Sequence, residues 1–248
     1  MTRGDLSERR LIQLLCGTEA RRQESLAEMS QLMDQVDTAH LLVLLKRVNL
    51  LVLLGRRLLS LGLGNVPELA RQLDSFTGQA WRWGVGTELA SLEVLDRLAT
   101  AGIRALSLSV LARELYGDVA TRSSADIDVL VAPEDLHDAV TAVSELGWRW
   151  DPGVRRVRGL PALHETLAHP TRPRVELHWR VHWYERRFAA EALERAEQMG
   201  SREPLRMQPL DGLIVLMLFY ARDGFSGLRF PVDVAAWWDL RCAGSSVP

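Results

Sequence analysis

The chain has 248 residues, of which 47% are hydrophobic and 25% are charged, so it can bury one large core or a core domain with helical additions. A formal net charge of −2 gives no global attraction to nucleic acid or to anionic membranes, which leaves a local basic patch as the way to bind nucleic acid. Cys16 and Cys242 lie near opposite ends, with no C-x-x-C spacing and no secretory signal, which predicts a reduced, cytoplasmic protein.

The first part of the chain, residues 6–102, has the leucine spacing of amphipathic helices. Asp37 or Thr38 is expected to cap a single helix over residues 41–61, and Pro67 is expected to begin another that runs to residue 100. The sequence therefore predicts a helical N-terminal subdomain.

Two features of this helical part exclude other functions. Residues 40–63 are the most apolar stretch, but lysine, arginine and asparagine interrupt them, so the stretch is too polar to span a bilayer. Residues 81–86, W-R-W-G-V-G, are expected to kink or break a helix. Their G-x-G is not a dinucleotide fingerprint, because no strand precedes it and the third glycine is missing.

The pattern changes near residue 103. Residues 103–108 and 126–131 are predicted strands, and residues 110–116 and 134–146 are predicted helices, the last one ended by Gly147. A strand–helix–strand–helix order predicts an α/β core.

The strand over residues 126–131 opens with two aspartates one residue apart. Asp126 and Asp128 project to one face of the strand, while Ile127 and Val129 project to the other. Paired oxygen ligands at this spacing suit Mg²⁺ or Mn²⁺, although a solvated strand end has the same pattern. The residues just before the pair are ones that would bind phosphate: Arg122, Ser123 and Ser124.

A second polar pattern alternates over residues 174–183, R-V-E-L-H-W-R-V-H-W, and predicts one strand of ten residues. Glu176 lies on its polar face, where a third carboxylate from a neighbouring strand would complete a site with the aspartates. A zinc site of Glu176, His178 and His182 is the alternative, but it leaves both aspartates unexplained. His164 and His169 are five residues apart, so they do not form the protease zinc motif.

Helices are predicted over residues 188–199, 209–221 and 228–240. The resulting division is a helical N-terminal subdomain over residues 1–102, a core over 103–185 and a C-terminal helical subdomain over 186–248.

These stretches resemble the nucleotidyltransferase superfamily of DNA polymerase β. More narrowly they are similar to an uncharacterised bacterial nucleotidyltransferase family with an L-Y-G-D segment, an arginine, D-I-D-L-L-V, an L-G-Y or L-G-W turn, and E-L-H-W. The matching residues are Leu111-Ala112, Leu115-Tyr116-Gly117-Asp118, Arg122, Asp126-Ile127-Asp128-Val129-Leu130-Val131, Leu146-Gly147-Trp148 and Glu176-Leu177-His178-Trp179. The resemblance covers about residues 103–183.

The resemblance implies a nucleotidyltransferase fold, with a small mixed sheet flanked by helices and helical additions at both ends. It implies transfer of a nucleoside monophosphate from an NTP, with ATP the expected one, to a hydroxyl or phosphate of a small molecule, peptide or RNA end. Asp126, Asp128 and Glu176 would bind Mg²⁺ or Mn²⁺ and carry the catalysis. His178 is expected either to contact the metal-binding carboxylates without binding the metal or to serve in packing. The nucleotide-binding residues would be Ser107, Ser109, Arg122, Ser123 and Ser124.

One departure concerns the turn after the first strand. Where the family carries lysine and glycine, this chain has Ser107 and Leu108, followed by Ser109. A leucine side chain would obstruct the approach of backbone N–H groups to phosphate, which Ser107 or Ser109 would then have to offset. Two alternatives follow: a non-catalytic binding or scaffolding protein that retains the fold, and a metal-dependent hydrolase that uses the same carboxylates.

Overall fold

A computed structural model describes residues 3–63, 67–108, 111–122, 124–152, 160–198 and 204–242. Over these residues the chain forms a mixed α/β fold with eleven α-helices and a seven-stranded mixed sheet. The predicted fold class is therefore confirmed.

The described helices are α1 (Arg3–Leu15), α2 (Glu19–Glu24), α3 (Leu26–Met33), α4 (Thr38–Arg47), α5 (Leu51–Ser60), α6 (Pro67–Thr100), α7 (Leu111–Tyr116), the 3-10 helix η1 (Pro133–Asp135), α8 (Leu136–Glu145), α9 (Phe188–Arg195), α10 (Pro209–Arg222) and α11 (Arg229–Cys242). The strands are β1 (Ala105–Ser107), β2 (Asp126–Val131), β3 (Arg149–Trp150), β4 (His164–Ala168), β5 (Arg174–His178), β6 (Glu197–Gln198) and β7 (Leu205–Arg206).

The described residues group into two compact units, each built from separate stretches of the chain. The helical unit takes residues 1–82, 112–123 and 226–248, and the sheet unit takes residues 83–111 and 124–225. The chain therefore passes from one unit to the other four times. The predicted division at residues 102 and 185 stays a proposal about which segments fold on their own.

The helical unit is held together by a leucine-rich core. Leu11, Leu45 and Leu54 are among its fully buried side chains. Asp37 caps α4 by accepting hydrogen bonds from the backbone N–H groups of residues 39 and 40. The predicted single helix over residues 41–61 is wrong, because Asn49 between α4 and α5 has φ 54°, and a left-handed residue ends a helix.

The long helix α6 runs through residues 81–86 without interruption, so the break predicted there is wrong. Helix packing outweighs the propensity cost of about 1 kcal/mol for a glycine in a helix. Residues 67–82 of α6 belong to the helical unit and the remainder to the sheet unit.

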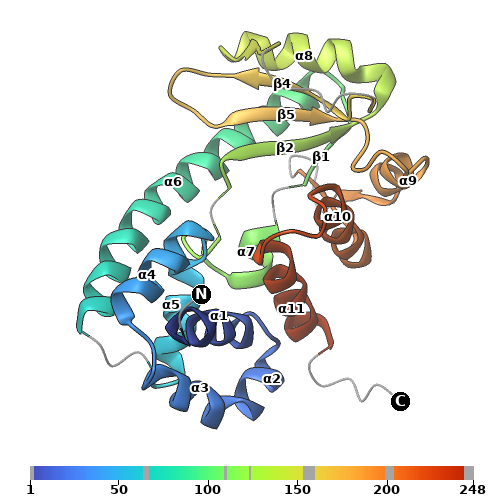
Figure 1. Ribbon diagram of the computed structural model, residues 1–248. Coiled ribbons are helices and arrows are strands. Elements are labelled where there is room, and N and C mark those ends of the chain that lie inside the picture. The colour runs from blue at the N-terminus through green and yellow to red at the C-terminus, as the bar shows by residue number, and fades with distance from the viewer. Residues whose placement is uncertain are drawn as a thin grey trace. The chain divides into compact units, whose positions relative to one another are not determined.

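The strand order is β3-β4-β5-β2-β1-β7-β6. Strand β2 pairs parallel with β5 and antiparallel with β1, while β4 pairs antiparallel with β5. Apolar residues of the sheet, such as Ile127 and Val175, join one core with Val94 and Leu98 of α6 and Val143 of α8 (Figure 1). These two helices therefore cover one face of the sheet, and the opposite face carries the polar residues of β2, β4 and β5.

The second polar pattern forms a shorter strand than predicted. Strand β5 ends at His178 instead of continuing to residue 183. His178 pairs with His164, the first residue of β4, and the next two N–H groups both reach the carbonyl of Leu163. The alternation continues in sequence, but no partner strand continues beside it among the described residues.

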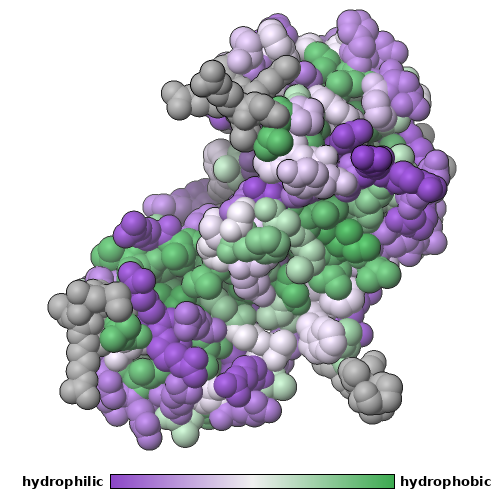
Figure 2. Space-filling model, turned by 45° about the vertical axis from the view of Figure 1, so that its right-hand side comes forward, coloured by the Kyte–Doolittle hydropathy of each residue, from purple (hydrophilic) through white to green (hydrophobic). Residues whose placement is uncertain are grey.

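Apolar side chains also reach the surface. Figure 2 shows a face on which apolar surface is bordered by polar surface. On α10 the exposed apolar residues include Leu210 and Met217. The buried residues of this helix, among them Val215, Leu216 and Phe219, recur at the spacing of a single helix face.

Candidate functional site

Two aspartates project from the polar face of β2. Their neighbours Ile127 and Val129 are fully buried in the core on the other face, while Asp126 and Asp128 are partly exposed. Strand alternation therefore fixes both carboxylates on one side of the sheet.

Glu176 comes to the same place from β5. The parallel register pairs Asp128 with Glu176 directly, so their side chains share a face. One carboxylate oxygen from each of Asp126, Asp128 and Glu176 lies within 4.8 Å of the others. Three oxygen donors at this separation fit a hard divalent cation such as Mg²⁺ or Mn²⁺.

His178 partly compensates the negative charge of this group. Its ring is fully buried, and Nε2 lies 3.1 Å from Oδ1 of Asp128 and 3.3 Å from Oε2 of Glu176. Burial by itself lowers the pKa of His178, but the hydrogen bonds and negative charges of the two carboxylates outweigh it and raise the pKa. His178 therefore touches the carboxylates themselves. On its other side its ring lies 6.0 Å from that of Phe219 of α10, centroid to centroid.

Ser124 lies where it can orient Asp126. The hydroxyl of Ser124 donates a hydrogen bond to Oδ1 of Asp126 at 3.0 Å. The indole N–H of Trp83 donates to the carbonyl of Ser124 at 2.7 Å, which ties this residue to α6. The structure thus joins Ser124 to the carboxylates, while Ser123 lies outside the described residues.

The turn after β1 places Ser107 and Leu108 on opposite faces of the sheet. Ser107 pairs with Val129, so it lies on the face away from the carboxylates. Leu108 follows it on the carboxylate face; its N–H donates to the backbone carbonyl of Asp128, and its side chain is buried. That N–H is already used by the sheet, and Ser109 lies outside the described residues. The structure does not bring Ser107 to the carboxylates.

Arg122 is engaged within the helical unit. Its Nε and Nη2 lie 2.9 and 2.8 Å from Oδ2 of Asp233, and both side chains are largely buried. The hydroxyl of Tyr116 donates to Oδ1 of the same aspartate, and burial, followed by the charge of Asp233, raises the pKa of Tyr116. Arg122 is predicted from the sequence to bind phosphate, but in the structure its guanidinium pairs with Asp233, which lies 111 residues away in the chain. Arg122 belongs to the helical unit and the three carboxylates to the sheet unit.

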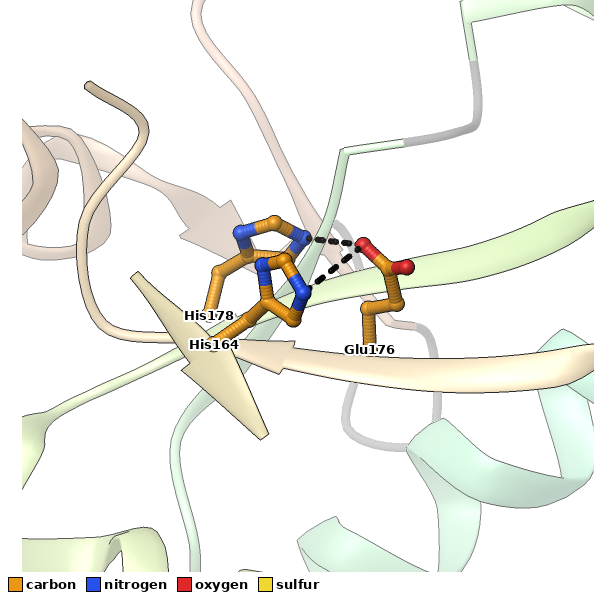
Figure 3. Close-up of side chains that lie close together, drawn as sticks. All are labelled: His164, Glu176 and His178. Atoms are coloured by element: carbon orange, nitrogen blue, oxygen red, sulfur yellow. Dashed lines mark ion pairs between the residues drawn. The ribbon is translucent and has the colours of Figure 1, made fainter. Parts of the chain in front are cut away.

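A second group of potential ligands overlaps the first. His164, Glu176 and His178 each offer one atom within 4.8 Å of the others. Nε2 of His164 lies 3.7 Å from Oε2 of Glu176, the oxygen that His178 also approaches (Figure 3). Burial lowers the pKa of His164, and the neighbouring His178 lowers it further.

The zinc alternative predicted from the sequence included His182. Instead, Nδ1 of His182 accepts a hydrogen bond from the backbone N–H of Tyr184, beyond the end of β5. His164 was considered only for the protease motif and was missed as a neighbour of Glu176. The pairing of β4 with β5 brings His164 close to Glu176, and the distance between the two residues along the chain does not reveal that pairing.

In the part of the chain that the structure describes, no helix is both long enough and apolar enough to cross a membrane.

Residues 34–244 match a protein family described as uncharacterised nucleotidyltransferase. No curated protein and no solved structure matches the chain.

Proposed function

Because the chain belongs to the uncharacterised nucleotidyltransferase family, we propose that it moves a nucleoside monophosphate from an NTP to a hydroxyl or phosphate acceptor. The observation that carries this proposal is the convergence of Asp126, Asp128 and Glu176 from two parallel strands. ATP is the first nucleotide to test. The acceptor classes are a small molecule, a peptide or an RNA end.

Each side chain of the site has a task in this reaction. Asp126, Asp128 and Glu176 would hold Mg²⁺ or Mn²⁺, which when bound neutralises triphosphate charge and favours ionisation of an acceptor hydroxyl. Ser124 fixes the carboxylate of Asp126 through its hydrogen bond. His178 restrains Asp128 and Glu176, so the ligand oxygens are positioned before substrate arrives.

The second candidate function is a non-catalytic protein that retains the fold. Leu108 is the observation that favours it, since a buried leucine replaces the family glycine and its N–H is bonded to the strand that carries the aspartates. An N–H group that the sheet already uses is not available to a phosphate. The three carboxylates favour the enzyme.

Calorimetric titration with each NTP, in the presence of Mg²⁺ or Mn²⁺, tests the proposal. Wild-type protein should bind at least one NTP only when the cation is present, and Asp126→Asn/Asp128→Asn should lose that binding. The matched control is Asp96→Asn/Asp138→Asn, which changes two exposed aspartates of the sheet unit and should bind as wild type does.

Binding alone does not separate transfer from hydrolysis. With radiolabelled ATP, transfer releases pyrophosphate and leaves the nucleoside monophosphate on the acceptor, whereas hydrolysis leaves it free. If folded wild-type protein binds no NTP with either cation, the non-catalytic function replaces the enzyme.

A further inference from the structure

We propose that His164, Glu176 and His178 form a second cation site, of mixed nitrogen and oxygen character, whose preferred occupant is Zn²⁺. The proposal goes beyond nucleotide transfer, because it concerns binding of a metal ion alone and requires no NTP. Its ligand set differs from the three carboxylates but shares Glu176, and on binding the ion Nε2 of His178 would exchange its contacts with Asp128 and Glu176 for a bond to the metal.

The distances fit zinc coordination. Nε2 of His164 and Nε2 of His178 lie 3.7 and 3.3 Å from the same oxygen, Oε2 of Glu176. Ligands about 2.0–2.2 Å from a tetrahedral zinc ion stand roughly 3.3–3.6 Å apart, so the separation of 3.3 Å for His178 fits directly and that of 3.7 Å for His164 is slightly longer. Figure 3 shows both Nε2 atoms directed at the glutamate.

The sheet itself sets this geometry. The antiparallel register pairs His164 with His178 directly, and their ring centroids are 4.7 Å apart. Glu176 precedes His178 by two residues on the same strand and therefore shares its face. Side chains mounted on paired strands are held more precisely than side chains on loops, so little rearrangement is needed to bind an ion.

Several buried polar atoms around the three residues lack a hydrogen-bond partner among the described residues. Thr166 pairs with Glu176 in the register and is nearly fully buried, and its hydroxyl has no hydrogen-bond partner among the described residues. The same holds for the Nδ1 atoms of both histidines, so each ring makes its polar contacts through Nε2. A buried polar atom without a partner costs about 1–3 kcal/mol, and of these atoms the hydroxyl of Thr166, which lies opposite Glu176, is the one that a ligand of this site would satisfy.

The donor types distinguish this site from its neighbour. Imidazole nitrogen suits zinc and related transition ions, whereas three carboxylates suit Mg²⁺ or Mn²⁺. Three protein ligands leave a coordination position open, which is characteristic of zinc sites that bind water or substrate and differs from closed structural sites.

Calorimetric titration of the full chain with Zn²⁺ alone, without nucleotide, tests the site. Wild-type protein should bind one Zn²⁺ ion, and His164→Ala should weaken that binding by more than the roughly 10- to 100-fold typical of a change outside the ligand shell. Asp126→Asn should bind Zn²⁺ about as wild type does. The matched control is His137→Ala, which removes an exposed imidazole from α8 of the same unit.

Co²⁺ gives a spectroscopic readout of the same site, since its visible absorption reports nitrogen ligands and tetrahedral geometry. The spectrum should appear in wild type and in Asp126→Asn and be lost in His164→Ala. His164→Gln, with circular dichroism to verify folding, keeps the test valid if the alanine variant unfolds.

Three results would overturn the proposal: no zinc binding by folded wild type, equal zinc affinity in wild type and a folded His164 variant, or loss of zinc in Asp126→Asn while His164→Ala retains it. The last would place zinc on the carboxylates. None of these outcomes depends on nucleotide binding, so failure of the transferase proposal leaves this test unaffected.

Discussion

Arg122 shows how a motif residue can serve a structural purpose. Its guanidinium holds Asp233, which is almost fully buried and also accepts from Tyr116. A buried charge must be paired, because desolvation without a partner costs several kcal/mol. Tyr116 and Arg122 both fall in the family pattern, and both meet at one aspartate of α11. We infer that this part of the pattern maintains the helical unit.

Changing Arg122 should therefore reduce stability. Arg122→Met leaves Asp233 buried without its cation and should lower the free energy of unfolding by about 3–5 kcal/mol, as for other broken buried pairs. Urea unfolding followed by circular dichroism measures this. Arg187→Met is the control, because Arg187 is exposed and its pair with Glu191 contributes less than about 1 kcal/mol. Unchanged stability with weakened NTP binding would instead assign Arg122 to phosphate.

The two cysteines differ in reactivity at the residue scale. Burial raises the pKa of the Cys16 thiol to about 11, whereas Cys242 is partly exposed. The thiolate is the reactive species, so at pH 8 Cys16 should react with iodoacetamide at least about tenfold more slowly than Cys242. Mass spectrometry of Cys16→Ser and Cys242→Ser variants measures each rate separately. Equal rates in the folded protein would contradict the burial of Cys16.

At the scale of elements, the pairing of β1 and β5 with β2 decides what surrounds the aspartates. Strand β5 supplies Glu176 and His178, and the end of β1 supplies Leu108. Glu176 and His178 are polar, and they contact each other. Leu108 is apolar and buried, and its N–H donates to the backbone carbonyl of Asp128.

Replacing Leu108 tests the role of this turn. Leu108→Ala should lower the free energy of unfolding by about 2–5 kcal/mol, because a buried side chain is lost, and Leu108→Gly by roughly 1 kcal/mol more. NTP affinity, measured by calorimetry below the unfolding temperature, should increase from wild type to Leu108→Gly if the leucine obstructs phosphate. Unchanged affinity in a folded glycine variant would show that this side chain is not the obstacle.

At the scale of the whole molecule, the candidate site belongs to one unit. All three carboxylates and both histidines of the cation sites lie in the sheet unit, on β2, β4 and β5. Arg122 and its partner Asp233 lie in the helical unit. Ligand binding should therefore stabilise the sheet unit first.

A bound nucleotide should slow the hydrogen exchange of backbone amides near its site. At about 100 times its Kd, Mg²⁺–ATP should add about 2.7 kcal/mol to the free energy of unfolding of wild-type protein. Hydrogen exchange measured by mass spectrometry should show this gain in β2 and β5 and not in α1 or α4. Asp126→Asn/Asp128→Asn should show neither effect. Protection confined to the helical unit would place the ligand elsewhere.

The sequence by itself determined what depends on near neighbours in the chain. The apolar alternation around Asp126 and Asp128 predicted β2 with its bounds, and Asp37 and Pro67 marked helix starts, because strand period and capping are local properties. Only the tertiary structure decided the rest. Strand register brought His164 to Glu176, placed Leu108 beside Asp128 and ended β5 at His178, while a contact 111 residues away occupied Arg122. Pairing between distant segments depends on how whole surfaces pack together, and no short stretch of sequence contains that information.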